Sequence, residues 1–149
     1  MKTNRLRTAV VALVISVIGG WASASAFAAE LTVYKTPWCG CCSGWTDHMQ
    51  ANGFSVTTKE VEDLDAIKRM AGVPEPLQSC HTAVVDGYVI EGHVPAEDVA
   101  RLLSERPDAK GLSVPGMPIG SPGMEGGTPE GYDVMLFGPG GSAEVYARH

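Results

Sequence analysis

The sequence predicts an α/β domain with the element order β-α-β-α-β-β-α, followed by a Pro/Gly-rich arm and a C-terminal β-hairpin. Three observations support this prediction. Segments with strand patterning alternate with segments of helical periodicity between residues 29 and 110. The dipeptide Asp86-Gly87 separates two short apolar runs, which is the strongest local signal for a hairpin. The length of 149 residues suits one domain.

Residues 1–28 have the pattern of a secretory signal peptide. Three basic residues precede an apolar run at 9–20, and Ala26 and Ala28 are the small residues of a cleavage site. An uncleaved anchor is the alternative, but the apolar run is short for a membrane span. We therefore expect cleavage, no membrane span in the mature chain, and a periplasmic location.

The first element of the domain is a strand at 31–35. A turn-rich stretch at 37–44 then leads into a helix of about ten residues that ends before Gly53. Trp45 and Met49 share one face of this helix.

A strand at 54–58 comes next, and a second helix follows it. Asp63 is a suitable N-cap for that helix, while Gly72 and Pro74 stop it. The buried stripe of the helix should consist of Leu64, Ile67 and Met70.

The hairpin and a third helix complete the domain. Strands at 82–85 and 88–91 flank the Asp86-Gly87 turn, and the helix begins at Pro95 and ends at Arg106-Pro107. This order is the thioredoxin-like arrangement, in which we expect the first and third strands to run parallel.

The last third of the chain differs in composition. Residues 111–131 are rich in proline and glycine without periodicity, which predicts an irregular arm. Residues 132–137 and 143–147 are expected to form a terminal hairpin. We assign 29–110 to the thioredoxin-like domain and 111–149 to an arm and hairpin packed on the same domain.

The charge balance excludes one class of partner. The formal net charge is −6, and removal of three basic residues with the signal peptide gives −9, from 8 basic and 17 acidic residues. Such a chain has no electrostatic footprint for nucleic acid and mildly attracts cations.

Cys39, Cys41 and Cys42 lie at the expected N-terminus of the first helix, where unpaired amides and the helix dipole stabilise thiolates. Three thiolates this close need protons, a disulfide or a cation to neutralise them. A soft cation fits best, because thiolate ligands favour copper(I), zinc or iron–sulfur clusters. The alternatives are a structural disulfide, or a thiol–disulfide oxidoreductase with Cys39 as nucleophile and Cys42 as resolving thiol.

Counting back from the Asp86-Gly87 turn sets Cys80 opposite His93, with Cβ atoms ~5 Å apart. Cys80 is thus a candidate fourth sulfur and His93 a candidate nitrogen ligand; a small buried residue or a disulfide partner is the alternative for Cys80. If the strand has already begun at His81, this side chain should point to the opposite face, which makes it a candidate for orienting a ligand.

Four further soft or basic side chains are less decisive. Met117 and Met124 recur in Pro-Gly-Met settings and are either gap-filling residues or thioether ligands. His48 is expected on the exposed side of the first helix, and His149 is close to the chain end.

Four separated segments, at 39–42, 79–83, 91–95 and 114–125, together resemble the CopG-type copper-resistance proteins, a periplasmic thioredoxin-like family. The sequence departs from ordinary thioredoxins because Cys41 replaces their proline and Ser79-Cys80-His81-Thr82 replaces their cis-proline segment. The resemblance implies copper binding by Cys39, Cys41, Cys42 and Cys80, and a role in interconverting copper(I) and copper(II).

These observations lead to one prediction. The protein should be a monomeric periplasmic copper(I)-binding protein that contributes to copper tolerance. Its metal ligands should be Cys39, Cys41, Cys42, Cys80 and His93. No catalytic residue is assigned, and other periplasmic copper-handling proteins are candidate partners.

Overall fold

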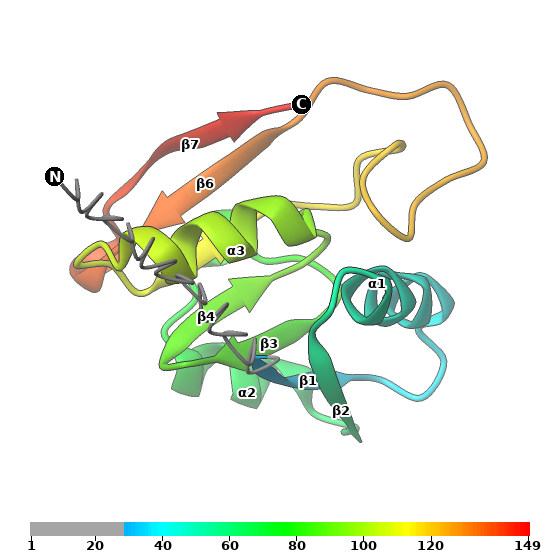
Figure 1. Ribbon diagram of the computed structural model, residues 1–149. Helices are drawn as coiled ribbons and strands as arrows, with labels where there is room; N and C mark the ends of the chain where they lie inside the picture. Colours follow the sequence, from blue (N-terminus) through cyan, green and yellow to red (C-terminus); the bar gives the residue numbers. More distant parts are fainter. Residues whose placement is uncertain (1–28) are drawn as a thin grey trace, which may run out of the picture.

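A seven-stranded mixed sheet forms the centre of the computed structural model, which describes residues 29–149 (Figure 1). The predicted signal peptide lies outside the described residues. The strands are β1 (Glu30–Lys35), β2 (Ser55–Glu60), β3 (Thr82–Val85), β4 (Tyr88–Glu91), β5 (Gly111–Ser113), β6 (Asp133–Phe137) and β7 (Ala143–Arg148). The helices are α1 (Gly40–Ala51), α2 (Leu64–Ala71) and α3 (Ala96–Glu105). The prediction of an α/β, thioredoxin-like fold is confirmed.

The strand order in the sheet is β2-β1-β3-β4-β5-β6-β7. β1 and β2 run parallel, joined by the crossover helix α1, whereas β3 runs antiparallel to β1. The expectation that the first and third strands are parallel is therefore wrong. After β2, helix α2 and a 3-10 turn return the chain to the edge where β2 ended, so β3 starts there, with Thr82 opposite Tyr34.

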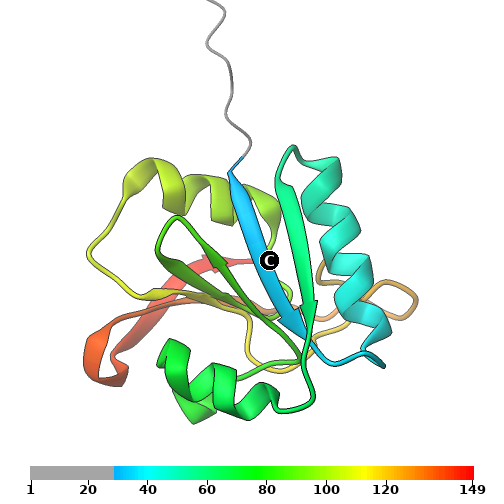
Figure 2. The same cartoon turned by 90° about the horizontal axis from the view of Figure 1, so that it is seen from below.

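Helices cover both faces of the sheet, and the two views agree on their placement (Figures 1 and 2). Helices α1 and α3 lie on one face, where Trp45 and Met49 are fully buried in the same cluster as Leu102. Helix α2 lies on the other face, above a smaller cluster that includes Leu77 and Phe137. The main core thus sits between the sheet and the α1 and α3 helices.

Helix α2 is capped as predicted but buries a different side chain. The Asp63 carboxylate accepts a hydrogen bond from the Ala66 amide (2.9 Å), and Gly72 ends the helix in the left-handed conformation. Met70, expected on the buried stripe, is 83% exposed, and Lys68 is buried instead. Lys68 turns inward because its ammonium pairs with a buried carboxylate on β4.

The hairpin of β3 and β4 has the predicted register, with Val85 opposite Tyr88 across the turn. Pro95 directly precedes α3, and Arg106 ends the helix in the left-handed conformation. These boundaries follow the sequence signals closely because each of them is set by local turn or cap chemistry.

The arm begins with a short strand that the Pro/Gly-rich composition of residues 111–131 did not predict. Gly111–Ser113 forms β5, which runs parallel to β4 and antiparallel to β6, so residues 111–113 belong to the sheet rather than to irregular structure. A side chain at Gly111 would place its Cβ 1.7 Å from the Val89 carbonyl oxygen, so the close pairing requires glycine. Within the described part of the chain, the helices are too short or too polar to cross a membrane.

Candidate metal centre

Three cysteines lie at the start of α1. Cys39 is the N-cap residue, and Cys41 and Cys42 occupy the first turn. Cys42 is fully buried, while Cys39 and Cys41 are partly exposed. The first backbone amides of a helix have no partner within the helix, so this position favours negative charge on the sulfurs.

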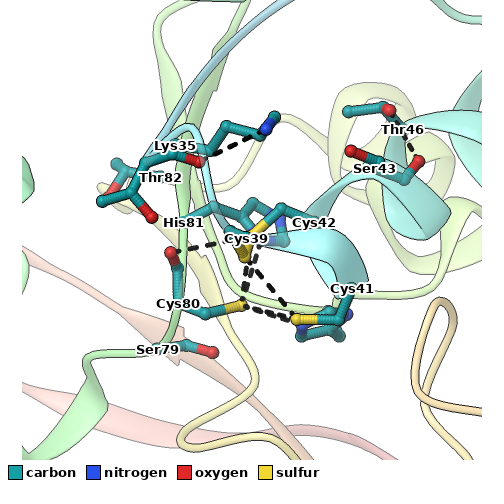
Figure 3. The surroundings of a disulfide bond; sticks show 12 residues. Lys35, Cys39, Cys41, Cys42, Ser43, Thr46, Ser79, Cys80, His81 and Thr82 are labelled. Atoms are coloured by element: carbon teal, nitrogen blue, oxygen red, sulfur yellow. Dashed lines mark hydrogen bonds between the residues drawn. A yellow bond between two sulfur atoms is a disulfide. The ribbon is translucent and has the colours of Figure 1, made fainter. Parts of the chain in front are cut away.

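Four sulfurs converge at this helix end (Figure 3). Cys39 and Cys42 form a disulfide, and Cys41 and Cys80 are free. The Cys80 sulfur lies 3.6 Å from that of Cys42 and 4.0 Å from that of Cys41, and the Cys41 sulfur lies 3.6 Å from that of Cys39. The four sulfur atoms all lie within 4.8 Å of one another, which is the spacing that one or more shared metal ions require.

The antiparallel direction of β3 brings Cys80 to the cluster. Cys39 follows the C-terminal end of β1, and Cys80 precedes the N-terminal end of β3. Since β3 runs opposite to β1, these two chain ends lie at the same edge of the sheet. A parallel β3 would have placed Cys80 at the far edge, so the corrected strand direction is what makes the cluster possible.

His93 lies next to Cys80, as the hairpin register predicted. Its Nε2 atom is 2.9 Å from the Cys80 sulfur, and its Nδ1 atom is 2.7 Å from the carbonyl oxygen of Pro122. A carbonyl can only accept, so Nδ1 carries the proton and Nε2 presents its lone pair toward Cys80. Burial lowers the pKa of His93, which favours the neutral ring that a metal ion needs.

His81, which directly precedes β3, contacts the Cys80 sulfur although its ring packs toward α1. Its ring lies against Trp45, with centroids 4.5 Å apart, yet its Nδ1 atom is 3.4 Å from the Cys80 sulfur. Within residues 29–149, its buried Nε2 atom finds no hydrogen-bond partner. Burial, then the neighbouring His93 ring and the positive charge of Lys68, place the pKa of His81 well below its ordinary value, so the ring is neutral.

A buried carboxylate that the sequence analysis missed holds the segment around Cys80. Glu91 is fully buried and accepts hydrogen bonds from the Ser79 amide and the Thr82 hydroxyl, each at 2.7 Å. It also pairs with the Lys68 ammonium. Burial raises the pKa of Glu91, and the contacts with Lys68, Ser79 and Thr82 offset part of that rise. The signal in the sequence was a single charged residue in an otherwise apolar strand.

The Cys80 thiol is held in its protonated form in the metal-free protein. Burial, then the neighbouring charge and hydrogen bond of Cys41, raise the pKa of Cys80 to about 12. A bound cation would offset both the burial of the thiolate and its repulsion by Cys41, because it supplies positive charge directly at the sulfur.

The remaining candidates are placed elsewhere or stay undecided. His48 is partly buried rather than on an exposed face, and its Nε2 atom accepts a hydrogen bond from the Ala96 amide at the start of α3. His149 is fixed by Asp98 (Nε2 to Oδ2, 2.7 Å) and stacks on Tyr132. Met117 is half exposed, and its role as a ligand, like that of Met124, stays a prediction.

The arm closes against the start of α1. A Cβ atom at Gly123, where φ is +84°, would lie 2.6 Å from the Trp45 amide nitrogen and 2.7 Å from the Cys41 carbonyl oxygen. This contact places the neighbouring Pro122 carbonyl on His93. The arm therefore forms one wall of the site.

Substituting Gly123 with alanine tests this wall. Gly123→Ala should lower the free energy of unfolding by about 1–3 kcal/mol more than Gly126→Ala, because the added methyl group overlaps backbone atoms of α1. Gly126 is the matched control, since its φ is +114° and, apart from its chain neighbours, no atom of residues 29–149 lies within 4 Å of its Cβ position. Urea denaturation of both variants measures the difference, and equal losses would show that the contact is not needed.

This chain is similar to one protein family and to two solved structures. A family model described as a protein of unknown function, DUF411, matches residues 77–124. A solved structure named copper resistance protein CopG, form 2, is 46% identical, with a TM-score of 0.78, covering 81% of this chain and 98% of that one. Form 1 of the same name is also 46% identical, with a TM-score of 0.76, covering 80% and 96%. No curated protein matches.

Proposed function

The chain belongs to the family of the copper resistance protein CopG, and from this membership and the sulfur cluster we propose that it is a periplasmic copper(I)-binding protein that contributes to copper tolerance. Cys39, Cys41, Cys42, Cys80 and His93 are the proposed ligands. The observation that carries the proposal is the convergence of four cysteine sulfurs within 4.8 Å at the start of α1.

The donor set favours copper(I) over harder metals. Thiolate sulfur is the softest ligand that proteins offer, and imidazole is acceptable to copper in either oxidation state. Two neutral imidazoles lie beside Cys80, and His93 already has its proton fixed on the nitrogen that faces Pro122. In the reduced protein, bridging sulfurs would allow one or more copper(I) ions to share the cluster.

The location is proposed from the N-terminal segment and the composition of the site. A signal peptide would deliver the chain to an oxidising compartment, where a disulfide such as Cys39–Cys42 persists. In that compartment the protein would act as a monomer that exchanges copper with other copper-handling proteins.

Replacement of all four cysteines tests the function. The reduced wild-type protein, isolated from a periplasmic fraction, should withhold copper(I) from a chromophoric chelator under anaerobic conditions. The variant with serine at Cys39, Cys41, Cys42 and Cys80 should lose that ability, because a serine hydroxyl is a hard and protonated ligand. Circular dichroism controls for folding. Retention of copper(I) by a folded variant would overturn the proposal.

A thiol–disulfide oxidoreductase is the second candidate, and the Cys39–Cys42 disulfide favours it. In that function Cys39 attacks a substrate disulfide and Cys42 resolves the mixed disulfide. The free thiols of Cys41 and Cys80 lie 3.6 Å from these sulfurs, so they compete as attacking groups. Insulin reduction by the metal-free protein, with and without copper(I), distinguishes the two functions: activity that copper inhibits supports this candidate.

A further inference from the structure

The disulfide divides the four cysteines into two pairs with different chemistry. Cys39 and Cys42 share a bond, and Cys41 and Cys80 are free. A disulfide sulfur carries no charge, whereas the thiolate is the form that binds soft metals. The disulfide form of the protein therefore offers two ionisable sulfurs where the reduced form offers four.

The free pair has the geometry of a site for one ion. The sulfurs of Cys41 and Cys80 are 4.0 Å apart, and the Nε2 atom of His93 is 2.9 Å from the Cys80 sulfur. With metal–sulfur bonds of about 2.3 Å and metal–nitrogen bonds of about 2.1 Å, two sulfurs on one ion lie at most ~4.6 Å apart, and a sulfur and a nitrogen at most ~4.4 Å. The Cys41–Cys80 and Cys80–His93 spacings both fall within these limits. Cys41 and His93 each lie close to Cys80 but do not belong to one group of mutually close ligand atoms, so one of these two side chains must shift toward the ion.

The free pair is also accessible and pre-oriented. Cys41 and Cys80 are both partly exposed, whereas Cys42 of the disulfide is fully buried. His93 is held by Pro122 with its lone pair toward Cys80. An ion can therefore reach the two free sulfurs, with His93 directly behind Cys80, while the disulfide stays intact.

We infer that the redox state of the Cys39–Cys42 pair sets the copper capacity of the protein. The disulfide form holds one copper(I) ion through Cys41, Cys80 and His93, and the reduced form holds more than one. Two thiolates give a single ion two sulfur ligands and leave no unshared sulfur for a second. Reduction adds two thiolates within 4.8 Å of the first two, which is enough for bridged ions. This inference rests on the proposed function and names a regulation of the same site.

The switch is a two-electron exchange with a dithiol donor. The Cys39–Cys42 sulfur–sulfur bond breaks, a disulfide forms in the donor, and the donor's two protons pass to the Cys39 and Cys42 sulfurs. Copper(I) that then binds displaces those protons. Capacity thus rises with reduction and falls with oxidation, with no change in the oxidation state of the copper.

Titration of the two redox forms tests the inference. Metal-free protein is prepared with two titratable thiols (disulfide form) and with four (dithiothreitol-reduced, then desalted without air). Each form is titrated with copper(I) against a chromophoric chelator. We expect one ion per chain in the disulfide form and at least twice as many in the reduced form. Peptide mapping after titration checks that the disulfide still joins Cys39 and Cys42.

Two double variants provide matched controls. Cys39→Ser/Cys42→Ser should bind one ion in either redox condition, and Cys41→Ser/Cys80→Ser should bind none while its disulfide is intact. Equal capacity in the two wild-type forms, or no binding by the disulfide form, would overturn the inference and leave the proposed function standing. Failure of the reduced wild-type protein to bind copper(I) would instead overturn the proposed function.

Discussion

Replacing Glu91 with leucine should lower the free energy of unfolding of the metal-free protein by about 3–5 kcal/mol. The substitution leaves the buried Lys68 ammonium without its partner, and it removes the acceptor for the Ser79 amide and the Thr82 hydroxyl. Few single changes in the described chain should cost more, because Glu91 is fully buried and Lys68 is 3% exposed. Urea denaturation with the disulfide intact measures the loss.

A double-mutant cycle separates the ion pair from the hydrogen bonds. Lys68→Met alone should also be strongly destabilising, since it leaves the Glu91 carboxylate buried without its counter-charge. Lys68→Met combined with Glu91→Leu should cost less than the sum of the two single changes, because no unpaired charge remains. Strictly additive losses would show that the pair is not coupled.

The same hairpin offers a surface control. Asp86 in the turn pairs with Arg106 at 2.6 Å, but both side chains are more than half exposed. Asp86→Asn should therefore change the free energy of unfolding by less than about 1 kcal/mol, because water and salt screen an exposed pair. The contrast with Glu91, five residues away, isolates the effect of burial.

Local chemistry explains which parts of the fold the sequence could predict. The Asp86-Gly87 turn sets the hairpin register, and that register places Cys80 beside His93. The start of α2 at Asp63 and the end of α3 at Arg106 are likewise determined by residues directly beside each helix. Each of these features depends on a few neighbouring residues, so it can be predicted from one sequence.

Features that depend on residues far apart in the sequence could not be predicted. The direction of β3 relative to β1 depends on where α2 returns the chain, and no periodic pattern encodes it. Lys68 replaces Met70 in the interior because of a partner that lies on β4, 23 residues further along. Strand β5 has only three residues and starts with glycine, so it shows no alternation of its own. In each case the deciding partner is remote in the sequence.

The candidate site shows the same division. Residues 39–42 and the hairpin count predicted that four sulfurs and His93 lie together, but they could not show that Cys39 and Cys42 pair while Cys41 and Cys80 stay free. Pairing among crowded sulfurs depends on ångström-scale geometry that spacing alone leaves open. The support of Cys80 by Glu91 was also missed, because it requires side chains from α2, β3 and β4 to meet.

The affinity for copper(I) should rise steeply with pH, and Cys80 should account for about tenfold of the rise per pH unit. Its pKa is raised to about 12 by burial and by Cys41, so the sulfur is protonated throughout the range from pH 6 to 8. Copper(I) binds the thiolate, so binding releases this proton. As long as the pH is below the pKa, each rise of one pH unit makes loss of the proton tenfold easier. Competition titrations across this range, corrected for protonation of the chelator, measure the slope.

Cys80→Ser should weaken copper(I) binding and reduce the slope of log affinity against pH by about one, because the serine hydroxyl neither binds the ion nor releases a proton. Ser79→Ala, next to it, should keep the wild-type slope, since Cys80 still supplies the proton. If the slope of the Cys80 variant equals that of the wild type, Cys80 does not ligate copper. The ion would then be held by the helix cysteines alone, and the meeting of β1 and β3 at one edge of the sheet would have no part in binding it.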